Sequence, residues 1–214
     1  MSVPILDAAT VLAVRDGDAG VEVLMLRRNL ESGFVPGAYL FPGGAVDAAD
    51  ADGGHDPFRV AAIRECFEEA GLLLARDASG AHPDTTDARF AAHRAAVAAG
   101  RESIQRVCAS EGLTLAVDEL HPLSRWVTPE GAPRRYDTRF FVVLAPSEQT
   151  PMHDDREAID HLWIRPADAL VRNARGDYEL ILPTLMSLRT LAEHDAATDV
   201  IASLLQADVH PHLG

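Results

Sequence analysis

The sequence predicts a mixed α/β (α+β) fold. Short aliphatic runs that are typical of strands occur at residues 9–28 and again at 139–164. Segments with the periodicity of helices follow each of these regions. No flexible linker divides the 214 residues. We therefore expect a single domain over residues 1–214, which is large enough to fold without disulfides.

Three strands are predicted in the amino-terminal part of the chain. Residues 9–15, 21–28 and 38–41 are rich in β-branched and aliphatic side chains. The glycine-containing segment 16–20 suits a hairpin turn, so the first two strands should be neighbours. The third run ends in Pro42-Gly43-Gly44, which we expect to bend the backbone sharply rather than continue a ladder.

A helix is predicted over residues 57–70. Asp56 can accept a backbone hydrogen bond at the helix start, and the proline that follows it is tolerated in the first helical turn. Gly71 is a suitable residue for the carboxyl-terminal end. The three leucines at 72–74 then predict a buried strand.

The remaining elements alternate between helices and strands. Residues 84–111 predict an inserted helical segment that Gly100 divides in two. Strands are predicted at 123–127, 139–144 and 159–164, and helices at 166–172, 182–194 and 199–206, the last two forming a carboxyl-terminal helical region of about 182–206.

Composition and charge exclude several classes of protein. The content of 47% hydrophobic and 24% charged residues is that of a globular chain, and the formal net charge of -14 opposes binding to a nucleic-acid backbone. Cys66 and Cys108 have no metal-binding spacing and are predicted to be small core residues. Because no long apolar run or basic leader is present, we expect a cytoplasmic protein without a membrane partner.

The helix at 57–70 carries three carboxylates on one face. At about 100° per residue, Glu65, Glu68 and Glu69 lie together, opposite an apolar face that can pack on a sheet. Such like-charged pairs cost about 0.2–0.5 kcal/mol each in an isolated helix, a cost that a bound cation would offset. Carboxylate oxygens are ligands that Mg²⁺ and Mn²⁺ prefer. Taken alone, the pattern also fits a solvated acidic face partly neutralised by Arg59 and Arg64.

The neighbouring residues favour the metal site. Residues 64–72 read Arg-Glu-Cys-Phe-Glu-Glu-Ala-Gly-Leu and match the Nudix-box half Arg-Glu-U-x-Glu-Glu-x-Gly-U, where U is bulky and apolar; Gly43 and Gly44 precede it. The chain thus resembles a Nudix hydrolase. The resemblance implies a mixed sheet sandwiched between helices and a Mg²⁺ or Mn²⁺ cofactor held by Glu65, Glu68, Glu69 and the Gly43 carbonyl.

One part of the box departs from the family pattern. The family places its glycine and arginine 14 positions apart, whereas Gly44 and Arg64 are 20 apart, so the loop holds six extra residues and the usual glutamate has no counterpart. Asp47, Asp50 and Asp56 are the candidates to replace it. Asp56 could cap the helix, and either Asp47 or Asp50 could pair with Arg64.

A wider likeness indicates the substrate. Residues 27–44 resemble the additional motif of coenzyme A diphosphatases, and the likeness to the peroxisomal type with an interrupted Nudix box extends over about residues 9–194. It implies that CoA or acyl-CoA is cleaved to 3′,5′-ADP and a 4′-phosphopantetheine. The residues expected to bind this small nucleotide substrate are Arg27, Arg28, Gly44, Arg134 and Arg135.

Several roles stay open. Glu65, Glu68, Glu69 and Arg64 form the expected catalytic group, with Arg64 orienting the glutamates. The general base is unassigned: Glu157, with Asp154 and Asp155, is a candidate loop carboxylate or an exposed acidic loop. The alternative substrates are ADP-ribose, dinucleotides and dNTPs, and a second class is a nucleotide-binding sensor without turnover. A homodimer is expected by analogy with the family.

Overall fold

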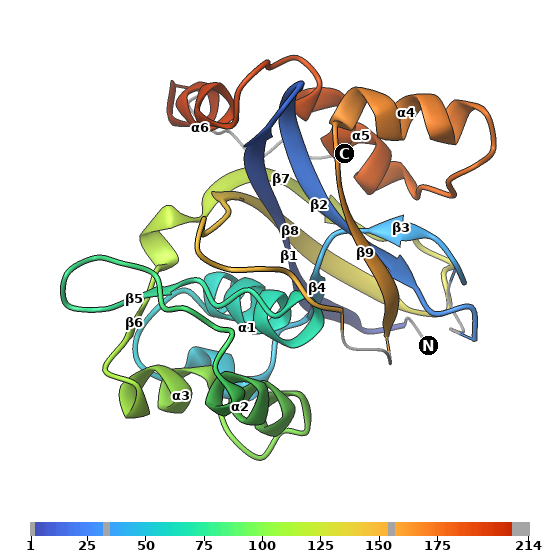
Figure 1. Ribbon diagram of the computed structural model, residues 1–214. Coiled ribbons are helices and arrows are strands. Elements are labelled where there is room, and N and C mark those ends of the chain that lie inside the picture. Colours follow the sequence, from blue (N-terminus) through green and yellow to red (C-terminus); the bar gives the residue numbers. More distant parts are fainter. Residues whose placement is uncertain (1–2, 32–34, 154–156, 207–214) are drawn as a thin grey trace.

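The computed structural model describes residues 3–31, 35–153 and 157–206. Within this part, seven strands form one mixed sheet, ordered β3-β2-β1-β8-β7, with β4 paired to β1 and β9 paired to β2 (Figure 1). The strands are β1 (Ile5–Gly17), β2 (Gly20–Arg28), β3 (Tyr39–Leu40), β4 (Gly43–Ala45), β7 (His121–Val127), β8 (Arg135–Leu144) and β9 (Ala158–Ile164). The predicted fold class is confirmed.

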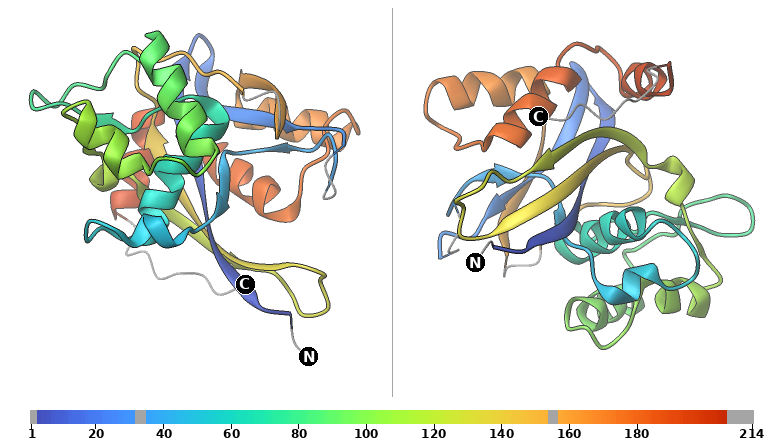
Figure 2. Two further views of the ribbon diagram at one scale, coloured as in Figure 1. Left: turned by 90° about the horizontal axis from the view of Figure 1, so that it is seen from below. Right: turned by 180° about the vertical axis from the view of Figure 1, so that it is seen from behind.

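Helices cover both faces of this sheet (Figures 1 and 2). The helices are α1 (Pro57–Ala70), α2 (Ala88–Ala98), α3 (Ile104–Ser110), α4 (Pro166–Ala174), α5 (Leu182–Leu191) and α6 (Ala197–Gln206), with short 3-10 helices η1 (Ala48–Ala51) and η2 (Val117–Glu119). A separate two-stranded ribbon pairs β5 (Ala75–Arg76) with β6 (Thr114–Leu115). None of the described helices is long and apolar enough to cross a membrane.

Strands β1 and β2 separate beyond their hairpin, and the next segment fills the opening. They pair only between residues 14–17 and 20–23. Farther along, β3 pairs with β2 and β4 pairs with β1, each on the side that faces the opening. Pro42 lies at a bend that ends β3, as predicted, whereas Gly43 and Gly44 pair with β1 in a new ladder that the sequence did not predict. The missing Cβ atoms permit this, since a Cβ on Gly43 would collide with the backbone of β1.

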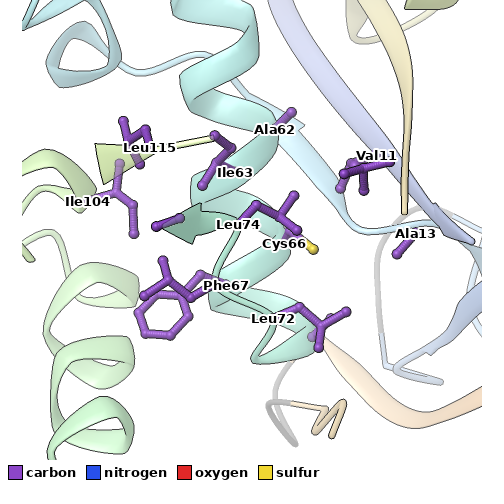
Figure 3. Close-up of a cluster of buried hydrophobic side chains, with 14 of the residues drawn as sticks. Val11, Ala13, Ala62, Ile63, Cys66, Phe67, Leu72, Leu74, Ile104 and Leu115 are labelled. Atoms are coloured by element: carbon purple, nitrogen blue, oxygen red, sulfur yellow. The ribbon is translucent and has the colours of Figure 1, made fainter. Parts of the chain in front are cut away.

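Helix α1 is buried on nearly every side. Ala62 and Cys66 face Val11 and Ala13 of β1, whereas Phe67 lies toward α2 and α3 (Figure 3). The predicted insertion is thus a second layer that covers α1, and its division into α2 and α3 is confirmed. A second core lies on the other face of the sheet, where α5 and α6 pack.

Of two predictions about buried residues, the strand at 72–74 is wrong and the burial of the two cysteines is confirmed. Residues 72–74 are fully buried but form no strand, because a side chain binds their backbone: Gln149 accepts from the Leu73 N–H at 2.8 Å and donates to the Leu73 carbonyl at 3.1 Å. Cys66 and Cys108 are buried as predicted, and burial raises the pKa of each thiol to about 12.

Candidate active site

The ends of α1 are fixed by the residues that the sequence indicated. The Asp56 carboxylate accepts from the Phe58 N–H at 3.1 Å, which makes Asp56 the amino-terminal cap. Gly71 ends the helix with a φ of 71°, a conformation that favours glycine. The predicted bounds of 57–70 are confirmed, and they place the three glutamates beside β4.

The three glutamates do not form a solvated acidic face. The Glu69 residue is only 5% exposed, and its Oε2 accepts from the Gly43 N–H at 3.0 Å. The side chains of Glu65 and Glu68 are 13% and 18% exposed. Glu65 lies against Gly44, so the β4 backbone approaches α1 closely at both glycines. The carboxylates of Glu65 and Glu69 therefore lie beside the glycine pair, and that of Glu68 is directed at Arg64.

Burial sets the electrostatics of this cluster. It raises the pKa of Glu65 to about 7, in spite of the opposing charge and hydrogen bond of Arg64. Burial also raises the pKa of Glu68, and it raises that of Glu69 well above its usual value, with the charge of Glu65 adding to the effect. A cation placed among these groups would stabilise their charged forms.

Arg64 connects the glutamates to the extended loop. Its Nε and Nη2 donate to the two oxygens of Asp50 at 3.0 and 2.9 Å, and its Nη1 donates to Glu65 at 2.8 Å and Glu68 at 3.2 Å. Burial alone would lower the pKa of Arg64, but the hydrogen bond to Asp50 and the acidic neighbours raise it. Asp50 is 1% exposed. Asp47, in contrast, is largely exposed, and its Oδ2 lies 3.9 Å from Nη2 of Arg64. Of the aspartates that the sequence left open, Asp50 is therefore the principal partner of Arg64.

The contact between Gly44 and Glu65 leads to a testable expectation. A Cβ at position 44 would collide with the Glu65 carboxylate, which is the movable end of a side chain. Gly44→Ala should therefore displace the carboxylate and lower kcat by about 10- to 100-fold, with little change in melting temperature. Steady-state kinetics and thermal unfolding would check this, and a fully active variant would contradict it.

A small cavity adjoins Gly43. It has a volume of about 110 Å³ and lies between the sheet and α5. Gly43 and Arg28 line it on the side of the glutamates, and the positive charge of Arg28 partly offsets the burial of Glu69. Its other walls include Thr10, Tyr39, Phe41, Phe140, Ile181 and Thr184. A group bound in this mainly apolar cavity would be adjacent to the carboxylate cluster.

The loop carboxylate Glu157 lies near the same cluster. Its backbone carbonyl accepts from the Asn29 N–H at 2.8 Å, which holds it beside the end of β2. Its charge adds to the effect of burial in raising the pKa of Glu65 and of Glu69. Asp154 and Asp155, the other candidates in this loop, lie outside the described residues.

For Arg27 and Arg135, two other predicted substrate-binding residues, the observed contacts are with groups outside the cluster. Arg27 faces Tyr39, with its guanidinium carbon 5.9 Å from the ring centroid. Arg135 begins β8 and donates to the Thr128 carbonyl in its own hairpin, with Arg134 just before it. A larger groove of about 530 Å³ between β9 and α4 contains none of the predicted site residues.

The donor set suits a hard divalent cation. Three carboxylates lie on one face of α1, burial disfavours their charged forms, and oxygen is the donor atom that Mg²⁺ and Mn²⁺ prefer. Over the described ranges, no three acidic, histidine or cysteine side chains are already arranged around one ion position. Glu65 and Glu68 instead turn to Arg64, and Glu69 turns to the Gly43 N–H.

Sequence comparisons agree with this site. A family model described as the NUDT19 Nudix domain matches residues 53–191. Human acyl-coenzyme A diphosphatase NUDT19 is 28% identical over 237 residues, which cover 85% of this chain and 63% of the human protein. A Caenorhabditis elegans protein whose name places it among the nudix hydrolases is 32% identical over 174 residues, 80% of this chain and 56% of that protein. The chain spans less than two thirds of the length of either relative.

Structural comparison gives the same result. The crystal structure of a NUDIX hydrolase from Alicyclobacillus acidocaldarius has a TM-score of 0.84 and 31% identity, covering 94% of this chain and 96% of the other. The NUDIX domain of Shewanella oneidensis NrtR, crystallised with ADP ribose, has a TM-score of 0.53 at 12% identity over 89% of this chain and 87% of that one, which shows a shared fold. Nudix hydrolases generally use divalent metal ions. The chain belongs to the NUDT19 family of Nudix domains, within the Nudix hydrolase superfamily.

Proposed function

We propose that this protein is a divalent-metal-dependent diphosphatase that cleaves CoA or acyl-CoA into 3′,5′-ADP and a 4′-phosphopantetheine. The observation that carries the proposal is the largely buried carboxylate cluster of Glu65, Glu68 and Glu69, in which Glu69 contacts Gly43 and Glu65 contacts Gly44. The substrate class follows the names of the relatives, which are acyl-coenzyme A diphosphatases.

Each residue of the cluster has a proposed role. Glu65, Glu68, Glu69 and the Gly43 carbonyl would hold Mg²⁺ or Mn²⁺. Such an ion neutralises charge on a diphosphate and acidifies a bound water. Arg64 orients Glu65 and Glu68 through the hydrogen bonds described above. Glu157 is the candidate to accept the proton of the attacking water, whose oxygen forms the new bond to phosphorus as the P–O–P bridge breaks.

The surroundings provide places for the rest of the substrate. Arg28 adjoins both Glu69 and the small cavity, where its guanidinium would contact a phosphate. The cavity walls of Tyr39 and Phe140 suit a planar or apolar group attached to that phosphate. Arg27, Arg134 and Arg135 remain predicted contacts for more distant parts of a long substrate.

A substrate panel tests the proposal. CoA, acyl-CoAs, ADP-ribose, NADH, diadenosine polyphosphates and dNTPs would each be incubated with Mg²⁺ or Mn²⁺, and the products identified by mass spectrometry. We expect CoA or acyl-CoA to give 3′,5′-ADP and a phosphopantetheine, with no product in the absence of metal. Turnover of another compound alone would contradict the assignment of CoA or acyl-CoA as the substrate. Tight binding of a nucleotide without any turnover would indicate a sensor.

A further inference from the structure

The inserted helical segment binds the extended loop of the Nudix box. Gln105, on α3, directs its amide nitrogen at η1, where it donates to the carbonyls of Ala49 at 2.8 Å and Asp52 at 3.3 Å. One amide group thus uses both of its hydrogens to hold two points of the loop. The two carbonyls belong to the residues on either side of the Asp50–Ala51 pair.

That loop presents the carboxylate on which Arg64 depends. Asp50 is 1% exposed and accepts three hydrogen bonds from the guanidinium, and it also accepts from the Asp47 N–H at 2.8 Å. Arg64 in turn donates to Glu65 and Glu68. Gln105 is therefore linked through the backbone of η1 to Asp50, and hydrogen bonds of Arg64 link Asp50 to Glu65 and Glu68.

Asp50 anchors the loop at one point, through its hydrogen bonds to Arg64 and to the Asp47 N–H. Helix η1 contains four residues, and the exposed glycines Gly53 and Gly54 follow it. The hydrogen-bond geometry of a 3-10 helix is poorer than that of an α-helix. In this loop, which is six residues longer than the family pattern, the contacts of Gln105 add a second attachment beside the Asp50–Arg64 pair.

The insertion is itself firmly attached to α1. Its Ile104 and Phe90 are buried in the same core as Ile63 and Phe67 of α1, and Figure 3 shows Ile104 facing this helix. Arg94, on α2, donates to the Glu68 carbonyl at 2.8 Å. Because the insertion contacts α1 at both the core and the carboxyl-terminal turn, Gln105 holds η1 from a support that is rigid relative to the glutamates.

We propose that Gln105 is a positioning residue, which fixes the extended loop so that Asp50 and Arg64 hold Glu65 and Glu68 in the arrangement needed for metal binding and hydrolysis. The inference rests on the proposed function. It assigns the insertion at 84–111 a role in the site, although none of its residues is proposed to touch the substrate.

Gln105→Glu is the decisive variant, because glutamate has nearly the same shape but a carboxylate that cannot donate to either carbonyl. Gln105→Ala serves as a second variant, and Arg106→Ala, at an exposed neighbouring position on α3, serves as the control. Hydrogen exchange of the metal-free protein, calorimetric titration with Mn²⁺ alone, and kcat with KM would be measured for each.

Both Gln105 variants should show faster amide exchange at residues 47–52, with unchanged exchange in the sheet. Mn²⁺ affinity and kcat should each fall by about 10-fold or more, with KM nearly unchanged, and the control should match the wild type. Unchanged exchange and Mn²⁺ affinity in Gln105→Glu would overturn the inference, as would exchange that rises uniformly along the chain. Failure of the proposed function would differ: the wild type would hydrolyse no diphosphate, while the exchange and Mn²⁺ results would still report on the loop.

Discussion

Glu69→Gln is expected to lower kcat for CoA by at least about 100-fold, because loss of an outer contact to a metal ligand already costs about 10- to 100-fold. Glutamine keeps the size of the side chain and can still accept from the Gly43 N–H, but it offers no negative charge to a cation. Since burial already raises the pKa of Glu69, a neutral side chain at this position should not weaken folding.

The measurement is kcat at saturating Mg²⁺ together with thermal unfolding. Glu148→Gln provides the control, because Glu148 is exposed and lies outside the carboxylate cluster. We expect the control to retain full activity and both variants to melt no lower than the wild type. A Glu69→Gln enzyme with an unchanged rate would refute the assignment of this side chain as a metal ligand.

Arg64→Leu is expected to lower the free energy of unfolding by about 3–5 kcal/mol, the usual effect of removing one partner of a buried ion pair. The substitution leaves Asp50 buried without its principal partner and removes the cation shared by Glu65 and Glu68. Activity should also fall, because these carboxylates would lose the group that orients them.

Urea unfolding at fixed pH would measure this change. Arg165→Leu is a suitable control, since its ion pair with Asp168 is about half exposed and such pairs contribute about 1 kcal/mol or less. Asp50→Asn should be less damaging than Arg64→Leu, because Arg64 would keep Glu65 and Glu68 as partners. Equal losses for Arg64→Leu and Arg165→Leu would show that the buried pairs contribute little to stability.

Most elements of the fold could be predicted from local signals. The α1 bounds followed from Asp56 and Gly71, whose capping roles depend only on neighbouring residues. The strand predicted at residues 72–74 is absent, because the backbone of Leu73 binds the side chain of Gln149, far along the chain. Likewise, the entry of Gly43 and Gly44 into the sheet depends on the separation of β1 from β2, a tertiary property that composition does not reveal.

The site was predictable to the extent that its residues share one helix. Glu65, Glu68, Glu69 and Arg64 are close in sequence, so spacing alone grouped them. The choice of Asp50 over Asp47 depends on the fold of the loop, since both lie in the same loop before α1 and only three positions apart. The contacts of Gln105 and the cavity walls Thr10 and Thr184 join distant segments and carry no periodic signal.

The pairing of three remote strands also determines how the site can assemble. Thr10 of β1 is aligned with Gly43 of β4 on one side and with Phe140 of β8 on the other, so a single rung of the sheet carries both a cavity wall and the glycine that contacts Glu69. A one-residue slip of β1 would turn its side chains to the opposite face. If the chain is split between β4 and β8, one fragment carries Thr10 and Gly43 and the other carries Phe140. Such fragments should recover ligand binding only when they associate.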